Sequence, residues 1–503
     1  MGKLIFSITF MFILHFTLSA QNTAQIIFND FLESKIVVLE DGSIVLASSI
    51  NSTIAGNGLD IQLTKLDTNY NQLWSKSFGN SNSERISDII YCYDKGFLIS
   101  SRVYNVNPPP YGSDFYAIIK FDSLGNYKWK INLPGMFFDK CEIRKTDDTS
   151  YFVKSHYWSG IWKGEVDCFL KINDLGDTLI NSRWLGVFTN YILDFEPINQ
   201  SHRMVTFDNA GSFVSNSLYS FIMDFTPFSN YPANSILFPD GLEITKLVPT
   251  DNGIVCVGNS NNDIILIDYS STINFKKLIG INEDRANSII KANDGGFIIC
   301  GSTHSFSASE DALLVKTDSL FNIQWSKTFG LDSINEEFIE VVEYNNKIIA
   351  NGIANSNSTY LVITDQNGES DCFGNNVVFN YSNSFSYYPY GMDVYELYLD
   401  TTLYPDTSTF QFFNQNLNIT DYCSLLNLQE NQSLNCMLYP NPTTGLITIK
   451  AENIVRVEII NIDGTQVYNG KENKIDLSNQ PKSIYILKLV TKKETKTWKI
   501  IKQ

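Results

Sequence analysis

Short runs of alternating apolar and polar residues, or short apolar blocks, fill most of the chain after its first twenty positions. Examples are "ISDIIY", which begins at Ile86, "GFLISS", which begins at Gly96, and "FYAIIKFD", which begins at Phe115. Both patterns are typical of short β-strands, and no later stretch shows the 3.6-residue period of an amphipathic helix. The pattern predicts an all-β protein.

A longer pattern recurs at intervals of about fifty residues. Its clearest copy, residues 293–330, is "NDGGFIICGSTHSFSASEDALLVKTDSLFNIQWSKTFG". It reads as a strand, a polar loop, a strand ending in "KTD", a turn, and a strand carrying Trp325. The same order recurs around Trp74 and Trp129, and more loosely around Trp184. With the apolar run that precedes each copy, every unit contains four short strands.

The residue that ends the third strand of each unit gives the register of the repeat. In seven successive units it is Asp67, Asp122, Asn173, Asp224, Asp268, Asp318 and Asp365. Neighbouring positions are 55, 51, 51, 44, 50 and 47 residues apart. A short carboxylate or amide can accept a hydrogen bond from the main chain two residues on, so we expect turn caps. A calcium-binding or catalytic ladder is the alternative, and the even spacing favours turns.

Seven units of four strands predict a seven-bladed β-propeller over residues 22–370. The units resemble the "DGG…I.aG.T…D.wliK.D..GN..W.k..GG" propeller repeats of secreted bacterial proteins, closely in the first, second and sixth units. The seventh unit lacks an outer strand, and "QIIFNDF" precedes the first unit. We expect residues near 25–31 to pair with the strand near 359–364 and close the ring, which leaves no bare sheet edge. A β-solenoid that does not close is the competing fold.

The start of the chain and its charge bear on where the protein acts. "MGKLIFSITFMFILHFTLSA" has a positive start, an apolar run and a small-residue end, which predict a signal peptide at residues 1–20. No later apolar run is long enough for a transmembrane segment. The 503-residue chain has a formal net charge of −17, which argues against nucleic acid as a partner.

Export also permits disulfide bonds. Cys372 and Cys423 bracket a segment without repeats and are the candidate disulfide, although the sequence leaves their pairing open. The cysteines that lie in strand-like runs are expected to be small buried residues: Cys92, Cys141, Cys168, Cys256 and Cys300.

The familiar motifs of catalysis and cofactor binding are absent from the sequence. His156, His202 and His304 have no second ligand at metal-binding spacing, and HExxH, GxSxG, P-loop and dinucleotide motifs do not occur. We therefore expect no cofactor and no metal, and assign no catalytic residue. A catalytic group assembled from separate blades stays open.

Two loops between second and third strands carry unusual aromatic residues. They read "VYNVNPPPYGS" and "SHYWSGIWKGEVD", and in a propeller such loops share a face with the blade-to-blade connections. Rings on stiff loops suit a sugar or a protein partner, because they bury area at little entropic cost. The candidate ligand face is Tyr104, Tyr111, Tyr157, Trp158 and Trp162. The alternative is that these rings pack on one another and on the blade rim.

The repeats stop at Cys372, and an irregular β appendage or linker is expected over residues 371–430. A new pattern begins at residue 436, where "LYPNPTTGLITI" and the "NIDGTQVY" hairpin introduce six or seven short strands. They predict a small antiparallel β-sandwich of the immunoglobulin-like kind over residues 436–503. From Lys450 onward Lys and Arg outnumber Asp and Glu, unlike the rest of the chain.

Residues 436–503 resemble the type A C-terminal sorting domain of the type IX secretion system. The resemblance rests on "YPNP" with a following glycine, "NIDGTQVY", "IDLS…IYILKL" and the closing "KIIK"; its motif residues are Tyr439, Pro440, Asn441, Pro442 and Gly445. It implies the secretion machinery as a partner. It also implies export through the periplasm of a Gram-negative bacterium to the outer-membrane surface or beyond. An ordinary sandwich domain without a sorting role is the alternative.

An exported binding or adhesion protein for a glycan or a protein is the function that these features favour. The alternatives are an enzyme that acts on extracellular polymer in the propeller funnel and a purely structural surface protein. Convergent carboxylates or a histidine in a deep central pocket would favour the enzyme. A shallow aromatic face would favour binding.

Overall fold

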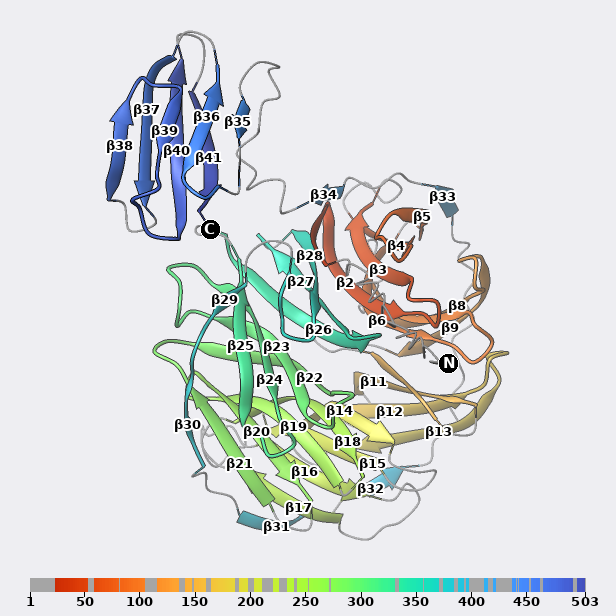
Figure 1. Ribbon diagram of the computed structural model, residues 1–503. Coiled ribbons are helices and arrows are strands. Elements are labelled where there is room, and N and C mark those ends of the chain that lie inside the picture. Colours follow the sequence, from red (N-terminus) through yellow and green to blue (C-terminus); the bar gives the residue numbers. More distant parts are fainter. Residues whose placement is uncertain are drawn as a thin grey trace, which may run out of the picture. The chain divides into compact units, whose positions relative to one another are not determined.

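A computed structural model describes residues 23–52, 58–80, 82–104, 115–134, 141–146, 149–159, 164–185, 190–197, 203–209, 220–225, 233–238, 242–251, 253–270, 273–330, 334–355, 357–370, 374–383, 388–392, 395–397, 411–414, 419–421, 437–439, 441, 443–451, 454–461, 465–491 and 495–502 (Figure 1). Within these ranges the side chains of residues 134, 156–169, 180–238, 388–421, 437–438 and 495–497 are not described. The predicted signal peptide lies outside the described residues. Every described element is a β-strand, so the all-β prediction is confirmed. The chain forms two compact units, Met1–Cys423 and Ser424–Gln503.

Within the described part of Met1–Cys423, seven antiparallel sheets follow one another in chain order, and we number them 1 to 7. Sheet 1 is β2 (Phe31–Val38), β3 (Ile44–Asn51), β4 (Leu59–Leu66) and β5 (Gln72–Gly79). Sheet 2 is β6 (Ser83–Tyr91), β7 (Phe97–Tyr104), β8 (Phe115–Phe121) and β9 (Tyr127–Pro134). Sheet 3 is β10 (Glu142–Lys145), β11 (Tyr151–Ser159), β12 (Gly164–Ile172) and β13 (Thr178–Leu185). Sheet 4 is β14 (Asn190–Pro197), β15 (Arg203–Asn209), β16 (Ser220–Phe225) and β17 (Ala233–Phe238).

The remaining sheets follow the same plan. Sheet 5 is β18 (Glu243–Thr250), β19 (Gly253–Ser260), β20 (Asp263–Tyr269) and β21 (Ile273–Ile279). Sheet 6 is β22 (Asp284–Lys291), β23 (Phe297–Thr303), β24 (Asp311–Thr317) and β25 (Ile323–Phe329). Sheet 7 is β26 (Glu336–Tyr344), β27 (Lys347–Ala354), β28 (Ser358–Asp365) and β1 (Ala24–Asn29).

The middle strands of a sheet are buried on both faces. All 7 residues of β23 and all 7 of β24 are buried. Packing between two neighbouring sheets requires such strands to be apolar throughout, which is why they read as short blocks such as "GFIICG". First strands such as β26 instead mix buried and partly exposed positions.

The first strands of the sheets form an unbroken series of neighbours. β2 contacts β6, and the series continues through β10, β14, β18 and β22 to β26, which contacts β2 again. Apolar cores lie between successive sheets: the rings of Phe78 and Phe121 lie 4.7 Å apart between sheets 1 and 2. Those of Phe329 and Phe338 lie 5.7 Å apart between sheets 6 and 7.

Strand β1, from the start of the described chain, completes the last sheet. It pairs antiparallel with β28, from Ala24 opposite Ile363 to Asn29 opposite Ser358. The prediction that residues near 25–31 pair with those near 359–364 is therefore confirmed. Tyr360 strengthens the junction, because its hydroxyl donates a 2.6 Å hydrogen bond to the Gln25 side chain.

The repeat aspartates lie at the turns between third and fourth strands. Oδ1 of Asp67 accepts hydrogen bonds from the N–H groups of Asn69 and Asn71, each 2.8 Å long. The same two bonds recur at Asp122, Asn173, Asp318 and Asp365. Asp268 instead lies inside β20, opposite Asn274, because that strand runs one residue further. Asp224 lies within β16, and its side chain is not described.

Glycines in these turns make room for the repeat tryptophans. Gly125 has a φ of +73°, and a Cβ there would lie 2.8 Å from the ring of Trp74 on the preceding sheet. Gly368, with a φ of +72°, meets Trp325 in the same way at 2.9 Å. The spacing of glycine and tryptophan in the repeat is thus a contact between neighbouring sheets.

Residues 371–430, the bridge segment, add strands to the sheets that precede them (Figure 1). Six described strands each pair with the outer strand of one sheet: β29 (Asn375–Asn376) with β25, β30 (Asn380–Ser382) with β21, β31 (Tyr388–Met392) with β17, β32 (Tyr395–Leu397) with β13, β33 (Gln411–Asn414) with β5, and β34 (Ile419–Asp421) with β1. The segment thus meets sheets 6, 5, 4 and 3 and then 1 and 7. Cys372 and Cys423 lie outside the described residues.

The unit Ser424–Gln503 contains two antiparallel sheets in its described part. One is β35 (Met437–Tyr439), β36 (Leu446–Lys450) and β39 (Lys474–Asp476); the other is β38 (Gln466–Gly470), β37 (Ile454–Asn461), β40 (Ile484–Thr491) and β41 (Thr495–Ile501). Side chains from both sheets, including Ile447 and Leu487, share one buried core. Alternation in "IYILKL" produces that core face directly, since Tyr485, Leu487 and Leu489 are buried while their neighbours are exposed.

Candidate functional site

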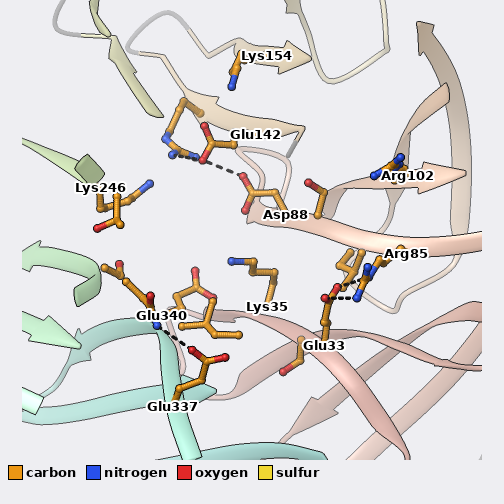
Figure 2. Close-up of a pocket in the computed structure, with 18 of the residues that line it drawn as sticks. Glu33, Lys35, Arg85, Asp88, Arg102, Glu142, Lys154, Lys246, Glu337 and Glu340 are labelled. Atoms are coloured by element: carbon orange, nitrogen blue, oxygen red, sulfur yellow. Dashed lines mark hydrogen bonds and ion pairs between the residues drawn. The ribbon is translucent and has the colours of Figure 1, made fainter. Parts of the chain in front are cut away.

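A cavity of about 630 Å³ opens among the first strands of the unit Met1–Cys423. Its lining comes from residues near the start of β2, β6, β10, β18, β22 and β26 and from the ends of β7 and β11. Figure 2 shows side chains from these strands converging on one space. Antiparallel pairing places first-strand starts and second-strand ends at the same sheet edge, so the cavity lies on the side of the second-to-third-strand loops.

The lining is dominated by charge. Six cationic side chains line the cavity: Lys35, Arg85, Arg102, Arg144, Lys154 and Lys246. Six carboxylates accompany them: Glu33, Asp88, Glu142, Glu243, Glu337 and Glu340. Their signal in the sequence is a charged residue near the start of each first strand, as in "ESK", "ERISD", "EIR", "EITK" and "EEFIE". The sequence reasoning missed it because the register was taken from the turn aspartates.

Several of these charges are paired across neighbouring sheets. Arg85 binds Glu33 through two contacts, Nε to Oε2 at 2.7 Å and Nη2 to Oε1 at 2.5 Å. Asp88 accepts a 2.8 Å bond from the main-chain N–H of Ile143 and lies 3.4 Å from Arg144. These contacts join the first strands of sheets 1, 2 and 3.

Two glutamates on β26 keep their protons to higher pH than usual. Burial raises the pKa of Glu340 above its ordinary value, although the cations Lys35 and Lys246 act in the opposite direction. Burial also raises the pKa of Glu337, and the nearby carboxylate of Glu310 adds to the effect. Glu340 accepts a 3.1 Å hydrogen bond from the N–H of Ile36, which joins sheet 7 to sheet 1.

Of the predicted ligand face, Tyr104 lies at the cavity. It is the last residue of β7, and the guanidinium carbon of Arg102 lies 4.3 Å from its ring centroid. Tyr157 and Trp158 lie near the end of β11, a strand that also contributes Lys154 to the lining, but their side chains are not described. Tyr111 and Trp162 lie outside the described residues.

A second cluster joins Cys92, Asp94 and Asp174, whose ligand atoms lie within 4.8 Å of one another. The Lys120 ammonium occupies its centre and donates 2.7 Å bonds to both carboxylates. Lys316 binds Asp294 in the same way in sheet 6. Because a lysine already supplies the positive charge, the cluster is a structural feature of the repeat rather than a cation site. Cys92, Cys141, Cys256 and Cys300 are buried free thiols.

In the second unit the "YPNP" motif is tied to the last strand. The Asn441 side chain donates to the carbonyl of Lys499 at 2.6 Å and accepts from the N–H of Ile501 at 2.8 Å. Gly445 lies so close to Ser478 that a Cβ would meet its hydroxyl at 2.2 Å. Tyr439 is 50% exposed, so its ring is available to a partner. Pro440 and Pro442 lie outside the described residues.

Residues 437–503 match the family described as the secretion system C-terminal sorting domain. This confirms the resemblance of the tail, and it implies export through the type IX secretion system to the cell surface or beyond. No curated protein matches the chain. A solved structure, the β-1,2-mannobiose phosphorylase from Listeria innocua in complex with β-1,2-mannobiose, has a TM-score of 0.24 and 9% identity over 67% of this chain and 90% of that chain. A likeness at that TM-score carries no argument.

The part of the chain that the structure describes holds no helix long and apolar enough to cross a membrane.

Proposed function

We propose that this chain is an exported glycan-binding protein in which a seven-bladed β-propeller carries the ligand site and the C-terminal domain is the sorting signal. Seven sheets of four strands support the propeller, as do first strands that contact one another in a cycle and a last sheet completed by β1. A closed ring leaves the starts of the first strands facing a common centre, where the cavity lies.

The proposed domains are a signal peptide at residues 1–20, the propeller at 22–370, the bridge segment at 371–430 and the sorting domain at 436–503. The pairing of β29–β34 with outer strands suggests that the bridge segment protects sheet edges. We propose a route through the periplasm of a Gram-negative bacterium, with the secretion machinery as the partner of the sorting domain. A disulfide between Cys372 and Cys423 would fasten both ends of the bridge segment.

The charged cavity carries the choice of a glycan over a protein. Its volume of about 630 Å³ suits a short oligosaccharide, and it is concave where protein-binding surfaces are usually flatter. Carboxylate, guanidinium and amide groups can bind sugar hydroxyls, and Tyr104 offers a ring face beside them. The loops that carry Tyr111, Trp158 and Trp162 would extend this surface at the cavity mouth.

A glycan array probed with the full chain tests this function. We expect binding that is weakened at least tenfold by Tyr104→Ala, the loss of one stacking ring. Tyr127→Ala is the matched control, because Tyr127 is 40% exposed and lies at the opposite end of sheet 2. Absence of any glycan binding, or equal effects of the two variants, would overturn the proposal.

A second candidate, hydrolysis of an extracellular polymer, is favoured by the raised pKa of Glu337. A carboxyl that keeps its proton can act as a general acid, and Glu142 offers a second carboxylate in the same cavity. Release of reducing ends from a bound glycan, abolished by Glu337→Gln, would establish this activity. Binding without release would leave the binding function alone.

A further inference from the structure

The carboxylates of the cavity are already engaged by the protein. Five of the six accept a hydrogen bond or form an ion pair with another protein group: Glu33, Asp88, Glu142, Glu337 and Glu340. The sixth, Glu243, is exposed. Bonds of this kind occupy carboxylate lone pairs, so the cavity has less capacity to receive positive groups than its equal charge count indicates.

Two ammonium groups share one of these carboxylates. Lys35 on β2 and Lys246 on β18 both act electrostatically on Glu340. Glu340 is surrounded by protein, where desolvation disfavours its charged form, and the N–H of Ile36 already occupies one of its oxygens. A single carboxylate with a weakened charge thus faces two cations, which leaves an excess of positive charge at this point.

The two lysines also point the right way. Figure 2 shows the side chains of Lys35 and Lys246 turned toward the same space, with Glu340 beside it. Both are partly exposed, and both line the cavity. They come from sheets 1 and 5, which are not neighbours in the series, so a group bound between them would sit near the centre of the first strands.

We propose that the ligand is an acidic glycan whose anionic group, a uronate carboxylate or a sulfate ester, binds between Lys35 and Lys246. This rests on the glycan-binding function proposed above and specifies its substrate class. Charge-assisted bonds from the two ammonium groups would hold the anion, and the other polar groups of the cavity would receive hydroxyls. Lys35 and Lys246 are thus specificity-determining residues.

Calorimetric titration of the full chain with three oligosaccharide probes tests the proposal. The probes are an oligogalacturonate, a sulfated galactan oligosaccharide and a neutral glucan of similar length. We expect one of the two acidic probes to bind at least tenfold more tightly than the neutral one, and to weaken as salt rises from about 50 to about 300 mM. Which acidic probe binds identifies the anion.

Variants separate the lysines from the fold. Lys35→Gln and Lys246→Gln should each lower the affinity for the acidic probe about tenfold, while Lys35→Arg restores it. Lys95→Gln is the control, because the Lys95 side chain is 67% exposed and pairs with Glu40 outside the cavity. Neutral binding that equals acidic binding, unchanged by Lys35→Gln, would overturn the acidic class while leaving glycan binding intact. Failure of all three probes and of the wider glycan array would instead overturn the function on which it rests.

Discussion

The carboxylate of Glu340 accepts a hydrogen bond from the main-chain N–H of Ile36, 3.1 Å away and 304 positions earlier in the chain. The bond joins β26 of the last sheet to β2 of the first. Asp88 makes the same kind of bond to Ile143, from sheet 2 to sheet 3. Some cavity carboxylates are therefore parts of the framework, which weakens the reading of convergent carboxylates as a sign of catalysis.

The Glu340 bond yields a test of stability. We expect Glu340→Leu to lower the free energy of unfolding by about 1–3 kcal/mol, because the N–H of Ile36 is left without its acceptor. Glu340→Gln retains an acceptor oxygen and should cost less. Urea unfolding of both variants measures the difference, and equal losses would show that the bond contributes nothing.

The contact between Gly368 and Trp325 predicts a second loss of stability. Gly368→Ala places a Cβ 2.9 Å from the indole at a φ of +72°, which disfavours any residue other than glycine. We expect a loss of about 1–3 kcal/mol in unfolding free energy from strain and displaced packing. Gly295→Ala has a similar φ of +86° but open space at the Cβ, so it isolates the backbone contribution. If the two variants lose the same stability, the tryptophan contact plays no part.

Local chemistry explains which features of the fold could be predicted from the sequence. Turn caps such as Asp67 and the pairing of β1 with β28 follow from short-range bonding and from the strand that unit 7 lacks. The pairing of β29–β34 with outer strands did not follow, because strands of 2 to 5 residues carry too little periodicity. Asp268 was placed at a turn because spacing alone cannot detect a strand that runs one residue longer.

The cavity was beyond sequence reasoning for a different reason. Lys35, Asp88 and Lys246 lie on separate repeats, and each alone reads as an ordinary surface charge on a half-exposed strand. Only the cycle of first strands brings them together. Tyr104 was selected for its loop, and its place at the cavity depends on strand direction as much as on its chemistry.

Glu84 at the start of β6 predicts a dependence of stability on pH. It is fully buried, and burial with the nearby Asp60 carboxylate raises its pKa from 4.5 to about 8. Between these pH values the folded state holds one proton more than the unfolded state, so this residue's contribution to stability falls as pH rises. The slope is at most about 1.4 kcal/mol per pH unit, and it ends near pH 8.

Removing the titrating group should flatten that dependence. We expect Glu84→Gln to gain stability relative to the unmodified chain as pH rises from about 5 to about 8, measured by urea unfolding at each pH. Glu40→Gln is the control, because the Glu40 side chain is 74% exposed. Parallel curves for Glu84→Gln and the unmodified chain would show that Glu84 does not carry the proton.

Asn441 links the start of the sorting domain to its last strand, and this link should matter for export. Asn441→Ala removes both the 2.6 Å bond to the Lys499 carbonyl and the 2.8 Å bond from the Ile501 N–H. We expect the domain to lose about 1–3 kcal/mol of stability and the strand β41 to loosen. Because a sorting signal must present a folded surface to its receptor, less protein should reach the cell surface and more should remain inside the outer membrane. Fractionation with antibody detection measures this, and Asn469→Ala is the control, since Asn469 makes one exposed 3.4 Å side-chain bond. Normal export of a destabilised Asn441→Ala would show that the machinery does not require this end of the domain to be fixed.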